Sequence, residues 1–276
     1  YHEPGILPLA FDGPTVVTVH DLSWIRHPEA HPVERVRAMN RYFPAGLART
    51  QRVLTDSAFV KRELVDLCGF PAEKISVVPL GVESLFRPLM ASETTDVLQP
   101  RDLTHGHYFL AVGTLEPRKN LGIALDAYAD LPNAIRQKFP LVLAGMKGWD
   151  NHQLEHRIGA MARAGEIRLL GYLPRADLAK VIAGATTLVF PSLYEGFGLP
   201  LLEAMACGVP VVSSNTASMP EVVGDTGVLL DPHDVAGMRE AMLWMASAPA
   251  ERQLLGGMAR ERSRQFTWPA CVEGTI

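Results

Sequence analysis

The sequence predicts an α/β protein whose C-terminal part forms a doubly wound parallel sheet, and three observations support this prediction. From residue 108 onward, short apolar runs alternate with helical segments in a complete β-α-β series. The run at 187–190 leads through a turn and two glycines into a short helix, and the run at 209–213 follows. With 47% hydrophobic residues, the 276-residue chain can bury one large core or two modest ones.

The N-terminal part carries fewer predicted strands than a doubly wound domain needs. These strands are 15–19, 52–55 and 75–78. Ser57 is typical of a helix N-cap and Gly69 of a helix end, so a helix is expected between them. A doubly wound sheet has about five or six strands, and the chain starts with Tyr1 rather than Met. We therefore expect an incomplete N-terminal domain over residues 1–86.

The boundary between the two domains is predicted from composition. Residues 87–107 are polar and irregular, which is typical of an interdomain linker. The C-terminal domain then covers residues 108–276. Its predicted strands are 108–112, 141–144, 167–170, 187–190, 209–213 and 227–230, and a helix over 250–265 closes it. Ser218 and Glu221 fit a capping box at the start of one of its helices.

Composition argues against several functional classes. A net charge of −4 gives no general attraction to nucleic acid. The sequence shows no run of 18 apolar residues and no signal peptide. The three cysteines, none of them in a C-x-x-C pair, fit a reducing cytoplasm, which is the predicted location. No P-loop occurs, and the G-x-G that starts at Gly196 lacks the third glycine of a dinucleotide-binding turn.

The glycine-rich stretch after the run at 187–190 carries the strongest functional signal. Gly196 and Gly198 free the backbone, so that its N–H groups can turn toward one ligand. The loop lies after a strand and before a helix, where open α/β sheets bind anionic ligands. Glu195 and Glu203 frame it, eight positions apart. Carboxylates only accept hydrogen bonds, which suits a sugar or ribose diol; alone, each is more typical of a turn or a helix end.

A second cluster follows the strand at 108–112, in the segment TLEPRKN. Asn120 is predicted to cap the next helix, so Arg118 and Lys119 stand immediately before its positive end. Two cations at a helix N-terminus favour a diphosphate site. The alternative is a pair of exposed loop cations.

Both segments resemble the retaining glycosyltransferases of family 4; the first reads E-G-F-G-L-P-L-L-E and the second G-T-L-E-P-R-K-N-L. The second is similar to the mannosyltransferase-like branch. The resemblance covers nearly the whole chain and implies a GT-B architecture of two Rossmann-like doubly wound domains. It implies that Glu195 contacts the donor sugar and Glu203 the ribose of the nucleotide. His20 is implied to face the donor sugar across the interdomain cleft, with a self-satisfied His-Asp turn as the alternative.

In the same family, the lysine that binds the donor phosphate falls on Lys119. Many members have an arginine directly after the first glycine of this motif, where this chain has Thr114, so we expect Arg118 to supply the second positive charge. The candidate donor contacts also include Gly113, Thr114, Gly196, Phe197, Gly198, Leu199 and Tyr172. Gly145 and Lys147 are candidates for the border of the nucleotide base, although a strand-end turn explains them equally.

The resemblance implies retaining transfer of a hexose to a glycan or lipid-linked glycan in envelope polysaccharide synthesis. The expected donor is GDP-mannose, with a UDP-linked sugar as the other choice. No cofactor is expected, and since no D-x-D occurs, no metal is expected to hold the diphosphate. Two alternatives stay open: a donor-binding fragment without transfer activity, which an incomplete N-terminal domain favours, and another nucleotide-sugar enzyme of this fold, such as an epimerase. An H-x-x-E-H pattern at 152–156 matches a metalloprotease motif but lacks a fitting context.

A basic stretch runs from Arg35 to Arg52, with apolar residues such as Val36, Met39 and Phe43 between the arginines. A basic amphipathic stretch of this kind can rest on anionic lipid at a membrane surface or on an anionic acceptor, but it is more often a solvated helix face. A peripheral contact with the inner face of the membrane is therefore one expectation, and a solvated helix face is the other.

Overall fold

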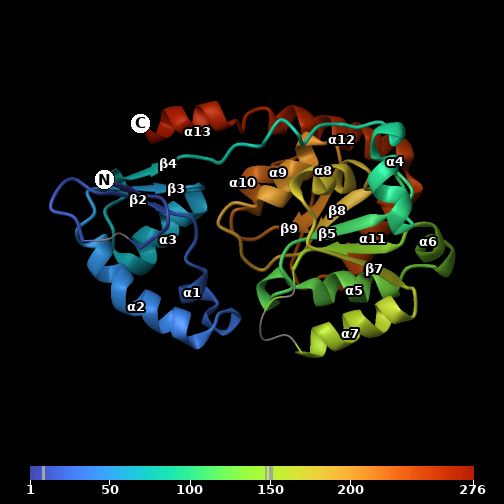
Figure 1. The fold of residues 1–276 in the computed structure, drawn as a ribbon, viewed down its shortest axis with the longest axis horizontal. Coiled ribbons are helices and arrows are strands. Elements are labelled where there is room, and N and C mark those ends of the chain that lie inside the picture. Colours follow the sequence, from blue (N-terminus) through green and yellow to red (C-terminus); the bar gives the residue numbers. More distant parts are fainter. Residues whose placement is uncertain (8–9, 147, 149–151) are drawn as a thin grey trace.

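The computed structural model describes residues 1–7, 10–146, 148 and 152–276, and it contains two parallel sheets with helices packed against them (Figure 1). The smaller, N-terminal sheet has the strand order β1-β2-β3-β4, and the larger has the order β10-β9-β8-β5-β6-β7. Every strand pairing within the described ranges is parallel. The predicted α/β class and the two Rossmann-like units are confirmed.

The N-terminal sheet holds one strand more than the sequence predicts. Its strands are β1 His2–Glu3, β2 Val16–Val19, β3 Arg52–Thr55 and β4 Ile75–Val77. Its helices are α1 Ser23–Arg26, α2 Val33–Leu47 and α3 Ala58–Cys68, with 3-10 turns at Pro28–Ala30 and Ala72–Lys74. With two residues, β1 is too short for an apolar pattern to reveal it. Val17, Val53 and Ile75 lie in register and pack against Phe43 and Leu64 of the helices.

Helix α3 begins and ends as its sequence predicts. The Ser57 side chain accepts a hydrogen bond from the backbone N–H of Val60 at 3.2 Å, which satisfies one of the free donors of the first turn. At the other end, Gly69 adopts a left-handed conformation with φ of 64°. The position of α3 is therefore fixed locally, and its first turn faces the C-terminal domain.

The segment 87–107 is not the irregular linker that its composition predicts. Residues Ala91–Leu98 form helix α4, and a 3-10 turn at Gln99–Arg101 follows. The backbone N–H of Met90 donates to the Glu93 carboxylate at 2.8 Å, which starts the helix. Val97 and Leu98 are buried in the C-terminal core. The few apolar residues of this polar segment thus lie on one face, and the segment belongs structurally to the C-terminal domain.

The larger sheet is doubly wound. Its strands are β5 Phe109–Val112, β6 Leu141–Ala144, β7 Ile167–Gly171, β8 Thr187–Phe190, β9 Val211–Ser214 and β10 Val228–Leu230. β5 lies between β6 and β8, so the strand order reverses at β5. The loops after β5 and β8 start side by side at this point, which is where open α/β sheets bind their ligands.

Helices cover both faces of the larger sheet (Figure 1). Besides α4, they are α5 Leu121–Ala129, α6 Asn133–Lys138, α7 His152–Arg163, α8 Arg175–Ala183, α9 Leu199–Ala206, α10 Met219–Val223, α11 Val235–Ser247 and α12 Pro249–Ser263, with a 3-10 turn at Pro117–Lys119. Leu110 and Leu188 pack in the cluster that includes residues of α8 and α9. Their neighbours Phe109 and Val189 pack in the cluster of α5, α7 and α11. Alternate residues of these strands thus fill two separate cores.

The last helix of the chain, α13 Trp268–Thr275, lies beside β4 of the N-terminal sheet (Figure 1). A Cβ at Gly81 would lie 2.1 Å from the backbone nitrogen of Trp268, and one at Gly274 would lie 3.2 Å from the Val78 side chain. The chain therefore crosses back to the N-terminal domain.

Two adjacent glycines of α12 give a test of the packing between α12 and the end of α9. A Cβ at Gly256 would lie 2.2 Å from the backbone oxygen of Gly208, whereas a Cβ at Gly257 would meet no atom within 4 Å. We expect Gly256→Ala to destabilise the fold by about 1–3 kcal/mol because helix and loop must separate. Gly257→Ala should stabilise it by up to about 1 kcal/mol through helix propensity. Urea unfolding of both variants measures this, and equal effects would contradict the packing.

Candidate active site

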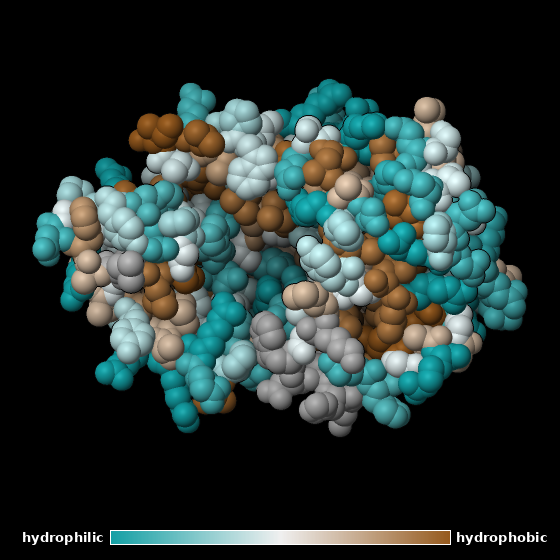
Figure 2. All heavy atoms as spheres, viewed as in Figure 1, coloured by the Kyte–Doolittle hydropathy of each residue, from teal (hydrophilic) through white to brown (hydrophobic). Residues whose placement is uncertain are grey.

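The glycine loop, residues 194–198, connects β8 to α9 and touches the N-terminal domain. A Cβ at Gly196 would lie 1.8 Å from the backbone oxygen of His20. The two domains therefore approach each other here at a distance that only a glycine permits. Gly198 has φ of 108°, a conformation that favours glycine, and α9 begins immediately after it. Figure 2 shows the hollow between the two domains on one face of the molecule, with hydrophilic side chains inside it.

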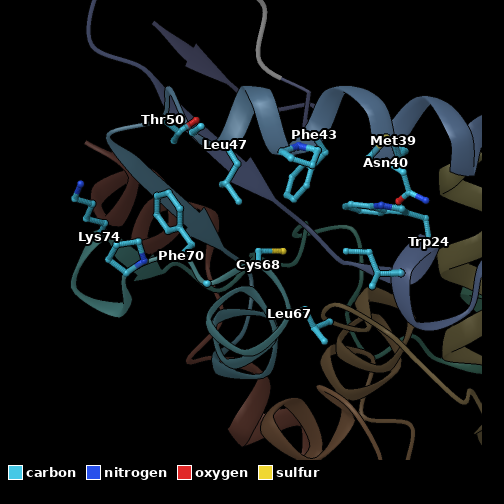
Figure 3. Close-up of a pocket in the computed structure, with 15 residues that line it drawn as sticks. Trp24, Met39, Asn40, Phe43, Leu47, Thr50, Leu67, Cys68, Phe70 and Lys74 are labelled. Atoms are coloured by element: carbon cyan, nitrogen blue, oxygen red, sulfur yellow. The ribbon is translucent and has the colours of Figure 1, made fainter.

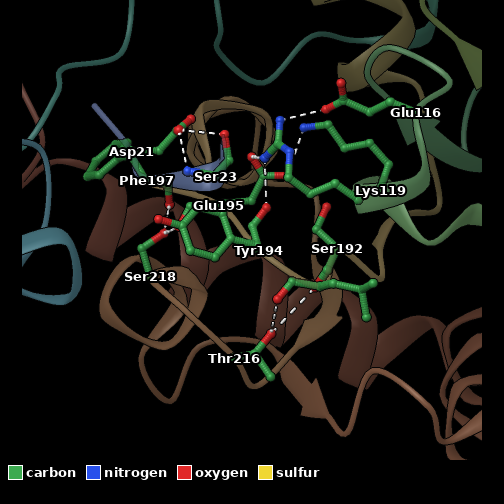
Figure 4. A network of polar contacts seen from close by, with 12 residues as sticks. Asp21, Ser23, Glu116, Lys119, Ser192, Tyr194, Glu195, Phe197, Thr216 and Ser218 are labelled. Atoms are coloured by element: carbon green, nitrogen blue, oxygen red, sulfur yellow. Dashed lines mark hydrogen bonds and ion pairs between the residues drawn. The ribbon is translucent and has the colours of Figure 1, made fainter. Parts of the chain in front are cut away.

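Glu195 is buried between two cations from the loop after β5 (Figure 4). Its carboxylate accepts hydrogen bonds from Lys119 Nζ at 2.7 Å and from Arg118 Nη1 at 2.9 Å. Burial alone would raise the pKa of Glu195, but Lys119 and Arg118 outweigh it and hold that pKa below its ordinary value. The sequence thus brings its two predicted clusters together in one ion network, at the strand where the sheet order reverses.

Arg118 is more fully engaged than a free phosphate-binding cation would be. Its Nη2 donates to Glu116 Oε1 at 2.6 Å, and its Nη1 also donates to the backbone oxygen of Tyr194 at 2.7 Å. Each cation here faces a carboxylate, since Glu116 and Glu195 balance Arg118 and Lys119. Lys119 has fewer partners than Arg118, and its amine lies 5.3 Å from the centre of the Phe190 ring.

The start of α5 differs from the sequence prediction at Asn120. Asn120 was expected to cap the helix through its side chain, but it adopts φ of 52° and makes no side-chain cap. Its amide nitrogen instead donates to the backbone oxygens of Pro191 at 3.1 Å and Pro232 at 2.7 Å. These carbonyls, which follow β8 and β10, compete successfully for the amide. Asn120 therefore ties three loops together at the carboxyl edge of the sheet.

Gly113, the first glycine of this motif, lies against Lys119. It has φ of 142°, and an added Cβ would lie 3.3 Å from the Lys119 side chain. Thr114 follows it in the same loop and is half-buried. Gly145, at the end of β6, packs on Gly113, since its Cβ would lie 1.9 Å from the Gly113 oxygen. The two glycines let the loops after β5 and β6 touch, and Lys147 lies outside the described residues.

Glu203 lies on α9, away from the Glu195 network, and has a partner that the sequence analysis missed. Arg175 Nη1 donates to Glu203 Oε1 at 2.8 Å, and Arg175 Nη2 pairs with Glu83. Glu203 is buried, and burial outweighs Arg175 and raises the pKa of this carboxyl. The available signal was the position of Arg175, which directly follows Pro174 at the start of α8 and near the carboxyl end of β7.

His20 lies at the carboxyl end of β2, but its ring interacts within the N-terminal domain. Nδ1 lies 2.7 Å from Asp56 Oδ2, and Nε2 lies 3.1 Å from the backbone oxygen of Pro4. The hydrogen bond with Asp56 raises the pKa of His20. Asp21 does not pair with His20; it accepts from the backbone and hydroxyl of Ser23. His20 thus contacts the glycine loop with its backbone oxygen. The alternative, a turn in which His20 pairs with Asp21, is not formed.

The remaining predicted donor contacts lie in different surroundings. Phe197 is buried and packs edge-on against Phe266, with ring centres 5.8 Å apart. Leu199 begins α9 and packs against the same core. Tyr172, in the loop after β7, is 71% exposed and is not gathered with the Glu195 network.

The predicted capping box of Ser218 and Glu221 is wrong. Ser218 Oγ donates to the backbone oxygens of Glu195 at 2.8 Å and Phe197 at 2.9 Å, so it holds the glycine loop instead (Figure 4). Glu221 Oε2 accepts from the backbone N–H of Ala58, in the other domain, at 2.7 Å. Partners distant in sequence therefore replace the local cap.

The N-terminal domain contains a pocket of about 660 Å³ beside α2 (Figure 3). Trp24, Phe43 and Phe70 are among its lining side chains, and Lys74 lies at its edge. Arg37 and Arg41 are exposed on α2, next to the pocket-lining side of that helix. The predicted basic stretch is thus helical only as far as Leu47, with one apolar, buried side and one basic, exposed side, while Arg49 lies in the following turn and Arg52 begins β3.

Within the parts of the chain that the structure describes, no helix is both long and apolar enough to span a membrane. The described side chains also contain no group of three or more histidines, cysteines or carboxylates placed to hold a metal ion.

Comparison with known proteins identifies the family. The model for glycosyl transferases group 1 matches residues 100–262, and the model for Glycosyltransferase Family 4 matches residues 2–84. The O-antigen chain mannosyltransferase B of Escherichia coli is 41% identical, over 100% of this chain and 72% of that protein. The serotype-specific mannosyltransferase WbdA of Escherichia coli is 29% identical, over 92% of this chain; the chain spans about a third of its length (32%).

Solved structures show the same fold. The Anabaena protein HepE, in a complex with UDP and glucose, aligns with a TM-score of 0.78 at 21% identity, over 95% of this chain and 70% of that one. WaaG, described as a glycosyltransferase of lipopolysaccharide biosynthesis, aligns with a TM-score of 0.77 at 17% identity, over 95% and 73%. With two family models covering most of both domains and a relative at 41% identity, the chain belongs to the group 1 glycosyltransferases of family 4, with the GT-B architecture.

Proposed function

We propose that this chain acts as a retaining mannosyltransferase, moving mannose from a nucleotide sugar, expected to be GDP-mannose, to a glycan or lipid-linked glycan of the cell envelope. The buried network of Lys119, Arg118 and Glu195 is the observation that carries the proposal. In this network two cations surround a carboxylate, which we assign to the donor sugar, at the switch point of the sheet and beside the N-terminal domain. The names of the two Escherichia coli relatives support mannose as the sugar.

The diphosphate of the donor would bind at Lys119 and the start of α5. No described side chain caps the first turn of α5, so backbone N–H groups there can donate to an anion. A phosphate at Lys119 would compete with Glu195 for the amine. Glu195 would then be free to accept hydrogen bonds from the sugar hydroxyls. Arg118 would keep its contacts with Glu116 and Tyr194 and hold the loop, while its charge still favours the anion nearby.

The chemistry needs no protein nucleophile. The acceptor hydroxyl forms a bond to the anomeric carbon on the face that the diphosphate leaves, and the bond between that carbon and the phosphate oxygen breaks. The departing phosphate oxygen takes the proton of the acceptor. The cations of the site offset the negative charge that develops on the leaving group, which is the role that a metal ion fills in other transferases.

Lys119→Ala should weaken the binding of a nucleoside diphosphate several-fold to about a hundredfold, because a charge-assisted phosphate contact contributes roughly 1.5–3 kcal/mol. Isothermal titration calorimetry with GDP, UDP and ADP measures the affinity and ranks the nucleotides. Lys138→Ala, an exposed lysine at the end of α6, is the matched control. Chelator should leave both affinity and turnover unchanged. Equal affinity in the wild type and Lys119→Ala would remove Lys119 from the donor site.

Alanine substitutions of Glu203 and Glu195 should affect different quantities, nucleotide affinity and turnover. Glu203→Ala should raise the Kd for the nucleotide, since Glu203 is assigned to the ribose and would exchange Arg175 for the diol. Glu195→Ala should mainly lower kcat, since Glu195 is assigned to the reacting sugar. Nucleotide affinity is measured by calorimetry, and turnover by release of nucleoside diphosphate from GDP-mannose with a mannose-terminated acceptor. Exchanged effects would mean that the two assignments are reversed.

The basic side of α2 is proposed to contact anionic lipid at the cytoplasmic face of the membrane, with the apolar pocket beside it. Arg37 and Arg41 lie one helical turn apart and are both exposed. Each basic residue near an anionic surface contributes about 1 kcal/mol, so a double charge reversal should reduce binding strongly. We expect Arg37→Glu with Arg41→Glu to abolish co-sedimentation with phosphatidylglycerol vesicles at low salt. Arg163→Glu with Arg239→Glu is the control for net charge, and equal binding of both double variants would contradict the contact.

A further inference from the structure

Helix α3 of the N-terminal domain and its N-cap contact the C-terminal domain in three places, two in the glycine loop and one on α10. Ser57 Oγ, at its start, donates to the backbone oxygen of Gly196 at 2.7 Å. The Tyr194 hydroxyl donates to the Glu63 carboxylate. The backbone N–H of Ala58 donates to Glu221, which lies on α10. One helix of the N-terminal domain thus binds both ends of the segment that holds Glu195.

Tyr194 belongs to the C-terminal domain, yet its side chain is enclosed by the N-terminal domain. Its ring lies edge-on to His27 and Phe59, with ring centres 5.6 and 5.5 Å away. Its hydroxyl also accepts from the backbone N–H of Leu22 at 2.9 Å. Tyr194 is 3% exposed, and burial raises the pKa of its hydroxyl, which therefore stays protonated and donates to Glu63.

Glu63 is held independently of Tyr194. It is 3% exposed, and Arg26 Nε donates to its Oε1 at 2.6 Å. The Arg26 side chain is 47% exposed, but its charge-assisted hydrogen bond engages Oε1 of the buried carboxylate and leaves Oε2 to accept from Tyr194. The acceptor for the tyrosine is thus already in place within the N-terminal domain.

The position of Tyr194 determines the position of Glu195. Arg118 Nη1 donates to the backbone oxygen of Tyr194 and to the carboxylate of Glu195, so the peptide between these residues is fixed from one side by Arg118. The contacts of Tyr194 and Gly196 with α3 fix it from the other side. We propose that Tyr194 and Glu63 are positioning residues, through which the N-terminal domain sets Glu195 against Lys119 and the donor sugar. This inference rests on the assignment of Glu195 to the reacting sugar.

Tyr194→Phe keeps the ring and removes only the hydroxyl. We expect kcat to fall by up to about a hundredfold, the loss typical of a small misplacement of a reacting group, while the Kd for the nucleoside diphosphate stays within about twofold. Glu63→Leu should cause the same loss of kcat with the same small change in Kd. Glu63→Gln, whose amide oxygen can still accept from Tyr194, should recover most of the turnover. The double variant Tyr194→Phe with Glu63→Leu should lose no more than either alone, because both remove one interaction.

Tyr128→Phe is the matched control. Its hydroxyl donates to the backbone oxygen of Glu166 at 2.9 Å, within the C-terminal domain and away from the glycine loop. It should lower the Tm without changing kcat. The positioning role is refuted if Tyr194→Phe also lowers the Tm without changing kcat. It is equally refuted if Tyr194→Phe weakens nucleotide binding by the same factor as it lowers turnover.

A second readout does not depend on turnover. The carboxyl carbon of Glu195, followed by ¹³C NMR in a pH titration, should titrate at higher pH in Tyr194→Phe than in the wild type, because the carboxylate moves away from Lys119 and Arg118. An unchanged titration would overturn the proposal even if the enzyme is inactive. Absence of turnover by the wild type with every nucleotide sugar would count against the proposed function only, since the titration still decides the positioning role.

Discussion

The structure of the site depends on the compensation of one buried charge, the carboxylate of Glu195. Burial of an isolated carboxylate is costly, and removal of one partner from a buried ion pair typically costs about 3–5 kcal/mol. Lys119 and Arg118 supply the compensation, and both come from the loop after β5, whereas Glu195 follows β8. The network therefore fixes the two loops against each other at the strand where the sheet order reverses.

The same network explains how the site tolerates two neighbouring cations. Glu195 occupies the place at Lys119 that a phosphate would take, and Glu116 occupies the second face of Arg118. In the proposed donor complex, the negative charge of the diphosphate would replace Glu195 at Lys119. Binding of the diphosphate and release of Glu195 toward the sugar would then be two parts of one exchange. At the proposed ribose position, Glu203 would exchange Arg175 for the diol, which carries no charge.

The sequence predicts those parts of the molecule that local residues determine. Apart from β1, the strands of both sheets, the start and end of α3, and the approach of the two motifs all follow from periodicity, caps and the parallel topology. Helix α4 was missed because its polar composition hides a narrow apolar face. Asn120 and Ser218 were misassigned for another reason: each has the side chain of a helix cap but bonds to a carbonyl far away in the sequence.

The partners of the proposed site residues were the hardest to predict. Arg175, Glu63 and Asp56 stand in ordinary helical or loop sequences, and only the fold brings them to Glu203, Tyr194 and His20. A motif shows which residue carries the chemistry, but the residue that holds it can come from any element nearby. The family resemblance did not assign these partners either, because its motifs cover Glu195, Glu203 and Lys119 but not the side chains behind them.

The enclosure of Tyr194 has a consequence for how the two domains work together. The C-terminal domain alone supplies Lys119, Arg118 and Glu203, so under the proposed assignment it would hold a nucleotide without the other domain. It cannot bury Tyr194, because the rings and the carboxylate that surround this side chain belong to the N-terminal domain. If the domains separated, Tyr194 would lose these partners and the peptide to Glu195 would keep only the contacts on the side of Arg118 and Ser218. Closure of the cleft and completion of the catalytic loop would then be the same event, and the sugar would meet an ordered Glu195 only when the acceptor side is also in place.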